Sequence, residues 1–388
     1  MTFEGTFADS SRKASEIRLP ELDGIRGLAI LFVLLWHCIG APLHPAYLMR
    51  GLDGGFLSIV KQSTIILRSG VDLFLVLSGF LIGGILFDNR KSSRFFPVFY
   101  GRRMLRIFPL YYLILVLFVV LKSFGANGVL FDGPIPVFSY LTFTQNYFMA
   151  HLGSSGAIWM GATWSLALEE QFYAGFPLLV HRCAMAAMPA VLVAGIILAP
   201  ILRIWTYFHF GNGQAGYEWL PCRIDALFVG ALLAYTLRQP AGRTWLHAKR
   251  RLLAAAFVPL FVGFIVLGIA ITSDMEYHSM VWGHTFLAYF YGWGILLSVI
   301  YAGSGATRFL RARWLTFLGL ISYGVYLLHL PVLFTVFGMF SRAVDVNSLR
   351  EEGLVLLSLA TTIVICAASY YVLEKPLIRL GHKWKYSV

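Results

Sequence analysis

Charged residues are scarce in this sequence. Only 13% of its 388 residues are charged, whereas 58% are hydrophobic. A soluble domain carries roughly 25% charged residues, so water cannot be the main solvent of this surface. Inside a lipid bilayer every backbone polar group must be paired, which only helices and closed barrels achieve. The apolar stretches run for about 20 residues without alternation, so they predict membrane-spanning helices rather than barrel strands.

Cysteine is also scarce, and no two cysteines form a CxxC pair or have the spacing of metal ligands. The four are Cys38, Cys183, Cys222 and Cys366. We therefore predict no structural disulfide and no metal site. The net charge of +12 would suggest a nucleic-acid partner in a soluble protein, but in this chain most lysines and arginines fall between apolar stretches. That distribution is a topology signal, so we expect no nucleic-acid partner.

Three of the segments between apolar stretches contain no lysine or arginine at all. They are 125–156, 208–221 and 273–281. The segments that alternate with them are rich in basic residues, and basic residues mark the cytoplasmic side of a membrane protein. Both termini are therefore predicted to be cytoplasmic, with an even number of spans. The segment 342–350, with Arg342 and Arg350, is the one mild exception.

The predicted fold class is an all-α polytopic membrane bundle of about ten helices. We place these at 24–43, 63–88, 103–124, 157–181, 184–207, 222–238, 252–272, 282–303, 314–341 and 354–374. The fourth is the least apolar, because Glu169 and Glu170 interrupt it. We divide the chain into a cytoplasmic tail (1–21), a membrane domain (22–376) and a second cytoplasmic tail (377–388). The first apolar run is interpreted as an uncleaved span rather than a signal peptide.

Charged side chains inside spans are costly and often functional. Arg26 stands at the start of the first span, and His37 follows eleven residues later. This spacing is about 16 Å of helical rise and close to three full turns, so the two side chains share a helix face. Such a face could hold the head of an anionic molecule at Arg26 and act on its far end at His37. The alternatives are a lipid-anchoring arginine and a hydrogen-bonded core histidine.

Arginines recur at the start of the third span, in the string RRMLRIFPLYY. Arg103 and Arg106 lie on one helix face, and guanidinium groups suit phosphate through bidentate hydrogen bonds. Plain cytoplasmic anchoring is the alternative. Asp72 is an isolated carboxylate in the second span that needs a cationic or hydrogen-bonding partner. Its role is either structural or in substrate binding.

The fourth span contains TWSLALEEQFY, in which Ser165, Glu169 and Tyr173 share a helix face. We expect one of the two adjacent glutamates to face inward and the other outward, and Ser165 and Tyr173 favour Glu169 inward. Glu169 could then orient the His37 ring or bind an acceptor hydroxyl. Tyr173 joins it as a candidate for substrate binding.

Polar side chains near the outer surface form a weaker set. Arg223 and Asp225 begin the sixth span and are either substrate contacts or a structural ion pair. The remaining candidates for acceptor contacts are Arg203, His209, His278 and His284.

Seven motifs, in this order, resemble the acyltransferase-3 family of membrane acyltransferases. They are LDGIRGLAILFVLLWH, SGVDLFLVLSGFLI, RRMLRIFPLYY, TWSLALEEQFY, RIDALFVGALLA, ISYGVYLLHLP and LEKP. The resemblance implies ten spans, an essential histidine at His37 paired with Arg26, donor binding by Arg103 and Arg106, and a motif glutamate at Glu169. Some members carry a fused SGNH hydrolase-like domain. None is visible in this sequence, so we expect transfer to be completed within the bundle or by a separate protein.

The resemblance implies an enzyme of a bacterial inner membrane that moves an acyl group, acetyl by default, from cytoplasmic acyl-CoA to a hydroxyl. Its expected partners are acyl-CoA, membrane lipid and an acceptor such as a cell-surface or exported glycan. A macrolide-type acceptor and a succinyl or short branched acyl group stay open, as does a covalent acyl-histidine intermediate. A transporter or flippase of a sugar or lipid-linked substrate is the alternative function. The oligomeric state also stays open, with a homodimer among the alternatives.

Overall fold

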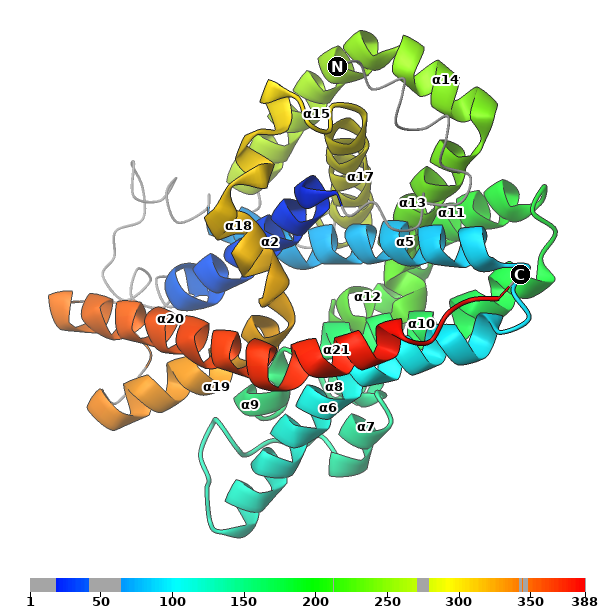
Figure 1. The fold of residues 1–388 in the computed structure, drawn as a ribbon. Coiled ribbons are helices and arrows are strands. Elements are labelled where there is room, and N and C mark those ends of the chain that lie inside the picture. Colours follow the sequence, from blue (N-terminus) through cyan, green and yellow to red (C-terminus); the bar gives the residue numbers. More distant parts are fainter. Residues whose placement is uncertain are drawn as a thin grey trace.

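The computed structural model describes residues 19–41, 64–211, 213–270, 279–341, 344 and 348–387. The expectations for most of the first tail, for His278 and for Arg342 lie outside these ranges. Within them the chain is helical and contains no strand (Figure 1). The predicted all-α fold class is therefore confirmed.

The helices follow one another along the chain with short connections. In order they are α2 (Pro20–Leu35), η1 (Trp36–Gly40), η2 (Ile66–Ser69), α5 (Gly70–Asn89), α6 (Phe95–Ser123), α7 (Val137–Leu141), α8 (Gln145–Leu152), α9 (Ile158–Gly161), α10 (Trp164–Arg182), α11 (Met188–Phe210), α12 (Gln214–Glu218), α13 (Leu220–Arg238), α14 (Pro240–Ala248), α15 (Arg250–Ala270), η4 (Ser279–Gly283), α17 (His284–Ile300), η5 (Gly305–Thr307), η6 (Phe309–Arg311), α18 (Arg313–Leu320), α19 (Ser322–Phe340), α20 (Leu349–Ser369), η7 (Tyr370–Glu374) and α21 (Lys375–His382).

Nine stretches of the described chain are long and apolar enough to cross a membrane. The expected fourth span is not among them, because its two glutamates and a glutamine lower the hydropathy of α10. This helix nevertheless runs the length of the bundle. Arg90, in the α5–α6 connection, donates to the carbonyl oxygens of His181 and Cys183 at one end of α10. At the other end, Thr163 accepts a hydrogen bond from Gln145. The described residues thus contain nine candidate spans, and α10 is a further, more polar helix of 19 residues.

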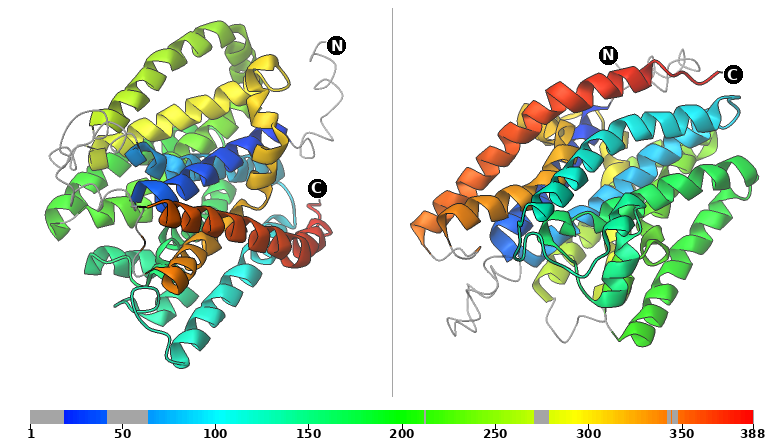
Figure 2. Two further views of the ribbon diagram at one scale, coloured as in Figure 1. Left: turned by 90° about the vertical axis from the view of Figure 1, so that its left-hand side faces the viewer. Right: turned by 90° about the horizontal axis from the view of Figure 1, so that it is seen from below.

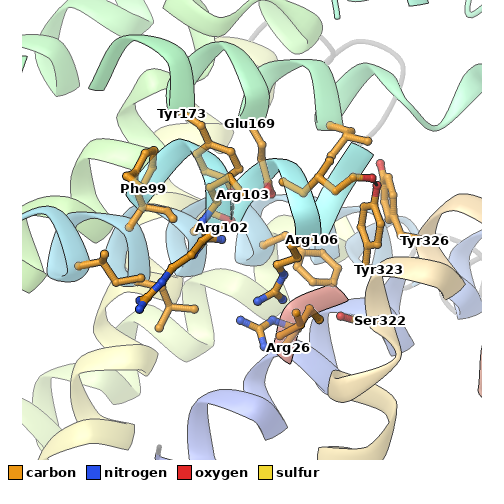
Figure 3. Close-up of a pocket in the computed structure, with 18 of the residues that line it drawn as sticks. Arg26, Phe99, Arg102, Arg103, Arg106, Glu169, Tyr173, Ser322, Tyr323 and Tyr326 are labelled. Carbon is orange, nitrogen blue, oxygen red and sulfur yellow. Dashed lines mark hydrogen bonds between the residues drawn. The ribbon is translucent and has the colours of Figure 1, made fainter. Parts of the chain in front are cut away.

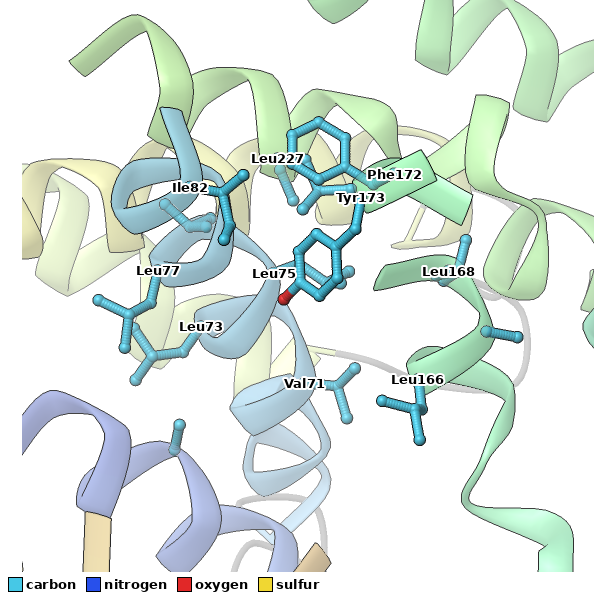
Figure 4. Packing of buried hydrophobic residues seen from close by; sticks show 14 of the residues in the cluster. Val71, Leu73, Leu75, Leu77, Ile82, Leu166, Leu168, Phe172, Tyr173 and Leu227 are labelled. Carbon is cyan, nitrogen blue, oxygen red and sulfur yellow. The ribbon is translucent and has the colours of Figure 1, made fainter. Parts of the chain in front are cut away.

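The helix α5 lies at the centre of the bundle and packs along α13, α2 and α17 (Figure 1). Its leucines and valines are buried on all sides, which is why its sequence is apolar all round rather than striped. Figure 4 shows the side chains of α10, with Phe172 and Tyr173, pointing toward α5 and toward Leu227 of α13. The wall between α5 and α10 is therefore packed over much of its length.

Three elements differ in extent from the sequence prediction. The helix α6 begins at Phe95, eight residues before the expected boundary, so its arginines stand in the second and third turns and not at the helix start. The expected span 314–341 is broken into α18 and α19 at Ile321. The last expected span continues through η7 into α21, and the resulting long curved rod crosses the bundle beside α6 (Figure 2).

Candidate active site

A cavity of about 360 Å³ lies between α2, α5, α6, α10, α19 and α21. We call it the arginine cavity. Its polar lining consists of Arg26, Ser78, Arg102, Arg103, Arg106, Ser165, Glu169, Tyr173, Ser322, Tyr323, Tyr326, His382 and Tyr386. Its apolar lining comes largely from α5, through Phe74, Leu81, Ile82 and Ile85. The cavity therefore offers several cationic groups on one side and a hydrocarbon surface on the other.

All three predicted donor-binding residues, Arg26, Arg103 and Arg106, line this cavity. Arg103 and Arg106 project from one face of α6, and the guanidinium of Arg26 comes from α2 to face that of Arg106 (Figure 3). Arg26 forms one ion pair, at 3.4 Å, with the carboxylate of Asp23. Neither Arg103 nor Arg106 forms an ion pair with any described residue. Grouped cations in a poorly solvated site repel one another, so the arrangement is suited to an anion.

A further wall of the cavity is formed by α10. The Tyr173 hydroxyl donates a 2.5 Å hydrogen bond to Oε2 of Glu169, and the guanidinium of Arg103 lies 5.7 Å from the centre of the Tyr173 ring (Figure 3). Ser165, one turn earlier, hydrogen-bonds with the Tyr326 hydroxyl at 2.6 Å. The three α10 residues expected on one face thus line the cavity together, with Glu169 inward.

The adjacent Glu170 was expected to face outward, but the structure does not place it there. Its Oε1 is buried and has no hydrogen-bond partner among the described residues. It lies outside the cavity lining.

His37 does not line the arginine cavity, although Arg26 does. It lies half-buried in η1, a turn of π-helix, which is a local geometry often found at functional sites. Its ring contacts that of His329 on α19, with the ring centres 4.9 Å apart. Tyr326, one turn before His329 on α19, lines the cavity. His37 is therefore connected to the cavity wall through His329, which stands one helical turn from Tyr326.

The hydrogen-bond partners of His37 and His329 indicate which ring nitrogen of each carries the proton. His329 Nδ1 lies 3.1 Å and 2.8 Å from the carbonyl oxygens of Val325 and Tyr326, which can only accept, so Nδ1 carries the proton. Nε2 of His329 is then an acceptor, and it faces Nδ1 of His37 at 3.3 Å. His37 Nδ1 also lies 3.0 Å from the Val33 carbonyl oxygen. Nδ1 of His37 is therefore the donor, and its Nε2 is the unprotonated nitrogen.

Three predicted substrate-binding residues lie in a buried ion-pair network away from the arginine cavity. Asp72 on α5 pairs with Arg223 on α13 at 2.6 Å, and His284 hydrogen-bonds to the same carboxylate at 3.1 Å. Asp225 pairs instead with Arg203 on α11 at 2.9 Å. Arg223 and Asp225 are thus not an ion pair with each other, which was one of the two roles expected for them. Two residues apart on a helix, their side chains point to different neighbours.

His382 and Tyr386 were not identified from the sequence as residues of the cavity, nor were Ser322, Tyr323 and Tyr326. The first two follow the last span, in a stretch without apolar periodicity. Nothing in their local sequence indicates that α21 returns along α6. Tyr323 and Tyr326 stand in an apolar run, where a tyrosine ordinarily serves in packing.

Comparison with known proteins agrees with these motifs. "O-acetyltransferase OatA" of Staphylococcus aureus (strain NCTC 8325 / PS 47) is 24% identical over 397 residues, covering 94% of this chain and 58% of the relative. "Putative peptidoglycan O-acetyltransferase YrhL" of Bacillus subtilis (strain 168) is 27% identical over 385 residues, covering 94% of this chain and 56% of the relative. The chain thus spans somewhat more than half the length of these relatives.

No solved structure matches the chain significantly. A family model described as an acyltransferase domain matches residues 19–374, a range that contains Arg26, His37, Arg103, Arg106 and Glu169. Because the match covers most of the chain, this protein belongs to the acyltransferase-3 family.

Proposed function

We propose that this protein is a membrane O-acyltransferase that takes an acyl group from acyl-CoA and transfers it to a hydroxyl of a cell-surface or exported glycan. Acetyl is the proposed acyl group because the relatives are named as O-acetyltransferases. The membrane is proposed to be a bacterial inner membrane, with the arginine cavity on the cytoplasmic side.

The observation that carries this proposal is the meeting of Arg26, Arg103 and Arg106 in one cavity. Coenzyme A is a polyanion with a diphosphate and a 3′-phosphate, and arginine binds phosphate through two parallel hydrogen bonds. The apolar α5 surface of the same cavity would accept the uncharged pantetheine arm. A transporter of a neutral sugar has no evident use for unpaired arginines at this point.

His37 is the proposed general base. Its unprotonated Nε2 would take the proton of the acceptor hydroxyl as the oxygen attacks the thioester carbonyl carbon. The new C–O ester bond forms, the C–S bond breaks, and the proton passes to the thiolate of CoA. Glu169 makes no hydrogen bond with His37, so we assign it the other expected role, binding a hydroxyl group. A covalent acyl-histidine is the variant mechanism.

Binding of CoA to the purified protein in nanodiscs, measured by calorimetry, tests the donor site. Arg106→Ala and Arg26→Ala should each weaken binding by about 10-fold to 100-fold, since a hydrogen bond to a charged group contributes about 1.5–3 kcal/mol. Arg243→Ala is the matched control, because it removes the same charge from an exposed arginine that lies outside the cavity. If Arg106→Ala binds CoA as tightly as the wild type, the cavity is not the donor site.

Acyl transfer itself is tested with His37→Ala. This variant should lose acetyl transfer while keeping CoA affinity, because His37 lies outside the arginine cavity. Wild-type activity in His37→Ala would refute its role as base. A wild-type protein that neither binds CoA nor consumes acetyl-CoA would favour the transporter alternative. Mass spectrometry of surface glycans from a deletion strain would identify the acceptor.

A further inference from the structure

The arginine cavity has a wall that lies outside the region shared with the family. The family match ends at residue 374, whereas Ile378, His382 and Tyr386 line the cavity from beyond that point. Ile378 and His382 belong to α21, and Tyr386 belongs to the segment 383–387 that follows it. We call this segment the strap.

The strap is held along the first turns of α6. The Arg102 guanidinium donates twice to the Trp384 carbonyl oxygen, at 3.0 Å from Nε and 2.5 Å from a terminal nitrogen. The Trp384 ring packs directly on Gly101, where a Cβ atom would overlap it. Beyond Tyr386, the Ser387 hydroxyl and that of Ser93 are 2.9 Å apart. The strap is therefore fixed on both sides of Tyr386.

Tyr386 is the residue of the strap that faces the cavity. Its ring lies 5.3 Å from the guanidinium of Arg102. Its hydroxyl is buried and has no hydrogen-bond partner among the described residues, which is costly for a polar group unless a ligand supplies one. Burial raises the pKa of the Tyr386 hydroxyl, although Arg102 and Arg103 lower it. The hydroxyl therefore keeps its proton at neutral pH and can donate it.

We propose that Tyr386 donates a hydrogen bond to a phosphate oxygen of CoA in the arginine cavity, and that the strap is part of the donor site. This inference rests on the proposed function, since it names a further residue for the same ligand. Tyr386 is a binding residue with no part in the acyl-transfer step. The neighbouring Arg103 supplies the charge, and Tyr386 supplies a directional donor beside it.

Calorimetric titration of CoA into the full chain in nanodiscs tests this role. Tyr386→Phe removes only the hydroxyl, and we expect CoA affinity to fall about 10-fold, as for loss of one hydrogen bond to a charged group. The matched control is Tyr371→Phe, because Tyr371 lies half-exposed in η7, beside Lys375 and outside the cavity. The thermal unfolding midpoint of neither variant should fall below that of the wild type, because the Tyr386 hydroxyl has no hydrogen-bond partner among the described residues to lose.

A second variant displaces the strap without changing Tyr386. Gly101→Ala places a methyl group where the Trp384 ring packs, so the strap must move and CoA affinity should fall by at least as much as in Tyr386→Phe. Gly338→Ala in α19 is the control, because its Cβ would meet no atom within 4 Å.

The possible outcomes separate the two proposals. If the wild type does not bind CoA at all, the proposed function fails. If the wild type binds CoA, Arg106→Ala weakens binding, and Tyr386→Phe binds as tightly as the wild type, then only the strap proposal is overturned. An equal loss of affinity in Tyr371→Phe would also overturn it, because the effect would not belong to the cavity.

Discussion

At the scale of single residues, His329 determines how the imidazole of His37 is presented. Its Nε2 accepts from Nδ1 of His37, while its own Nδ1 is occupied by two backbone carbonyl oxygens of α19. A neutral imidazole held in this way has one free lone pair, on Nε2. When that nitrogen takes a proton, the lone pair of His329 faces the resulting cation. His329 is therefore a positioning residue for the proposed base.

We predict that His329→Leu lowers kcat for acetyl transfer by about 100-fold, the lower end of what a positioned general base contributes. The KM for acetyl-CoA should change little, because His329 does not line the arginine cavity. His329→Gln offers an oxygen acceptor near the original Nε2 position and should retain more activity. Steady-state kinetics measure both constants.

The control for this prediction is His247→Leu, which replaces an exposed histidine of α14. Wild-type kcat in His329→Leu would contradict the positioning role. A direct readout is available in ¹⁵N-histidine spectra, where the chemical shifts should identify Nε2 of His37 as the unprotonated nitrogen. A proton found on that nitrogen in the neutral ring would equally count against the role.

The sequence predicts part of the site at this scale and fails where tertiary structure decides. Arg103 and Arg106, like Ser165, Glu169 and Tyr173, share helix faces through spacings of three or four residues, so their grouping can be inferred locally. Tyr386 enters the cavity only because the chain turns back along α6. The spacing of residues along the sequence gives no sign that the chain turns back along α6 at this point.

At the scale of elements, glycine sets how closely α5 and α13 approach. A Cβ atom on Gly79 would overlap the backbone of Leu227. One on Gly230 would come within 2.6 Å of the Phe80 nitrogen. Small residues at both helices let the two backbones come together, the usual means of tight packing in membranes.

We predict that Gly79→Ala destabilises the bundle by about 1–3 kcal/mol, because the added methyl group meets backbone rather than a movable side chain. Thermal unfolding in detergent, followed by tryptophan fluorescence, would show a lower midpoint. Gly338→Ala, which meets open space in α19, should unfold at the wild-type temperature. Equal midpoints for all three proteins would mean that the α5–α13 contact is looser than described.

The extent of the elements was predictable where hydropathy changes sharply and not elsewhere. The start of α6 at Phe95 was missed because aromatic residues precede its arginines in a stretch that also resembles a loop. The expected span 157–181 is divided into the short helix α9 and the helix α10, which begins only at Trp164. Its polarity reflects the cavity that it lines.

At the scale of the whole molecule, orientation follows from where the basic residues lie. The segment 125–156 contains no lysine or arginine, whereas the α5–α6 connection contains Arg90, Lys91 and Arg94. These two regions lie at opposite ends of α6. Positive residues stay on the cytoplasmic side, so both termini and the arginine cavity are predicted to face the cytoplasm.

Labelling of an introduced exposed cysteine tests this orientation, because the three native cysteines that remain are buried. In a chain lacking Cys183, the least buried of its four cysteines, Ser155→Cys should react in intact cells with a maleimide that cannot cross membranes. Lys91→Cys should react only after the cells are permeabilised. Both positions are exposed, so neither should be shielded by the fold. The reverse labelling pattern would invert the predicted topology.

The buried pair of Asp72 and Arg223 has a consequence for how the protein is made. The two residues are 151 positions apart, so the ribosome delivers the acid of the second span long before the base that neutralises it. A lone carboxylate in hydrocarbon costs several kcal/mol. We therefore predict that the early helices leave the insertion machinery for lipid only once α13 has emerged to pair with α5.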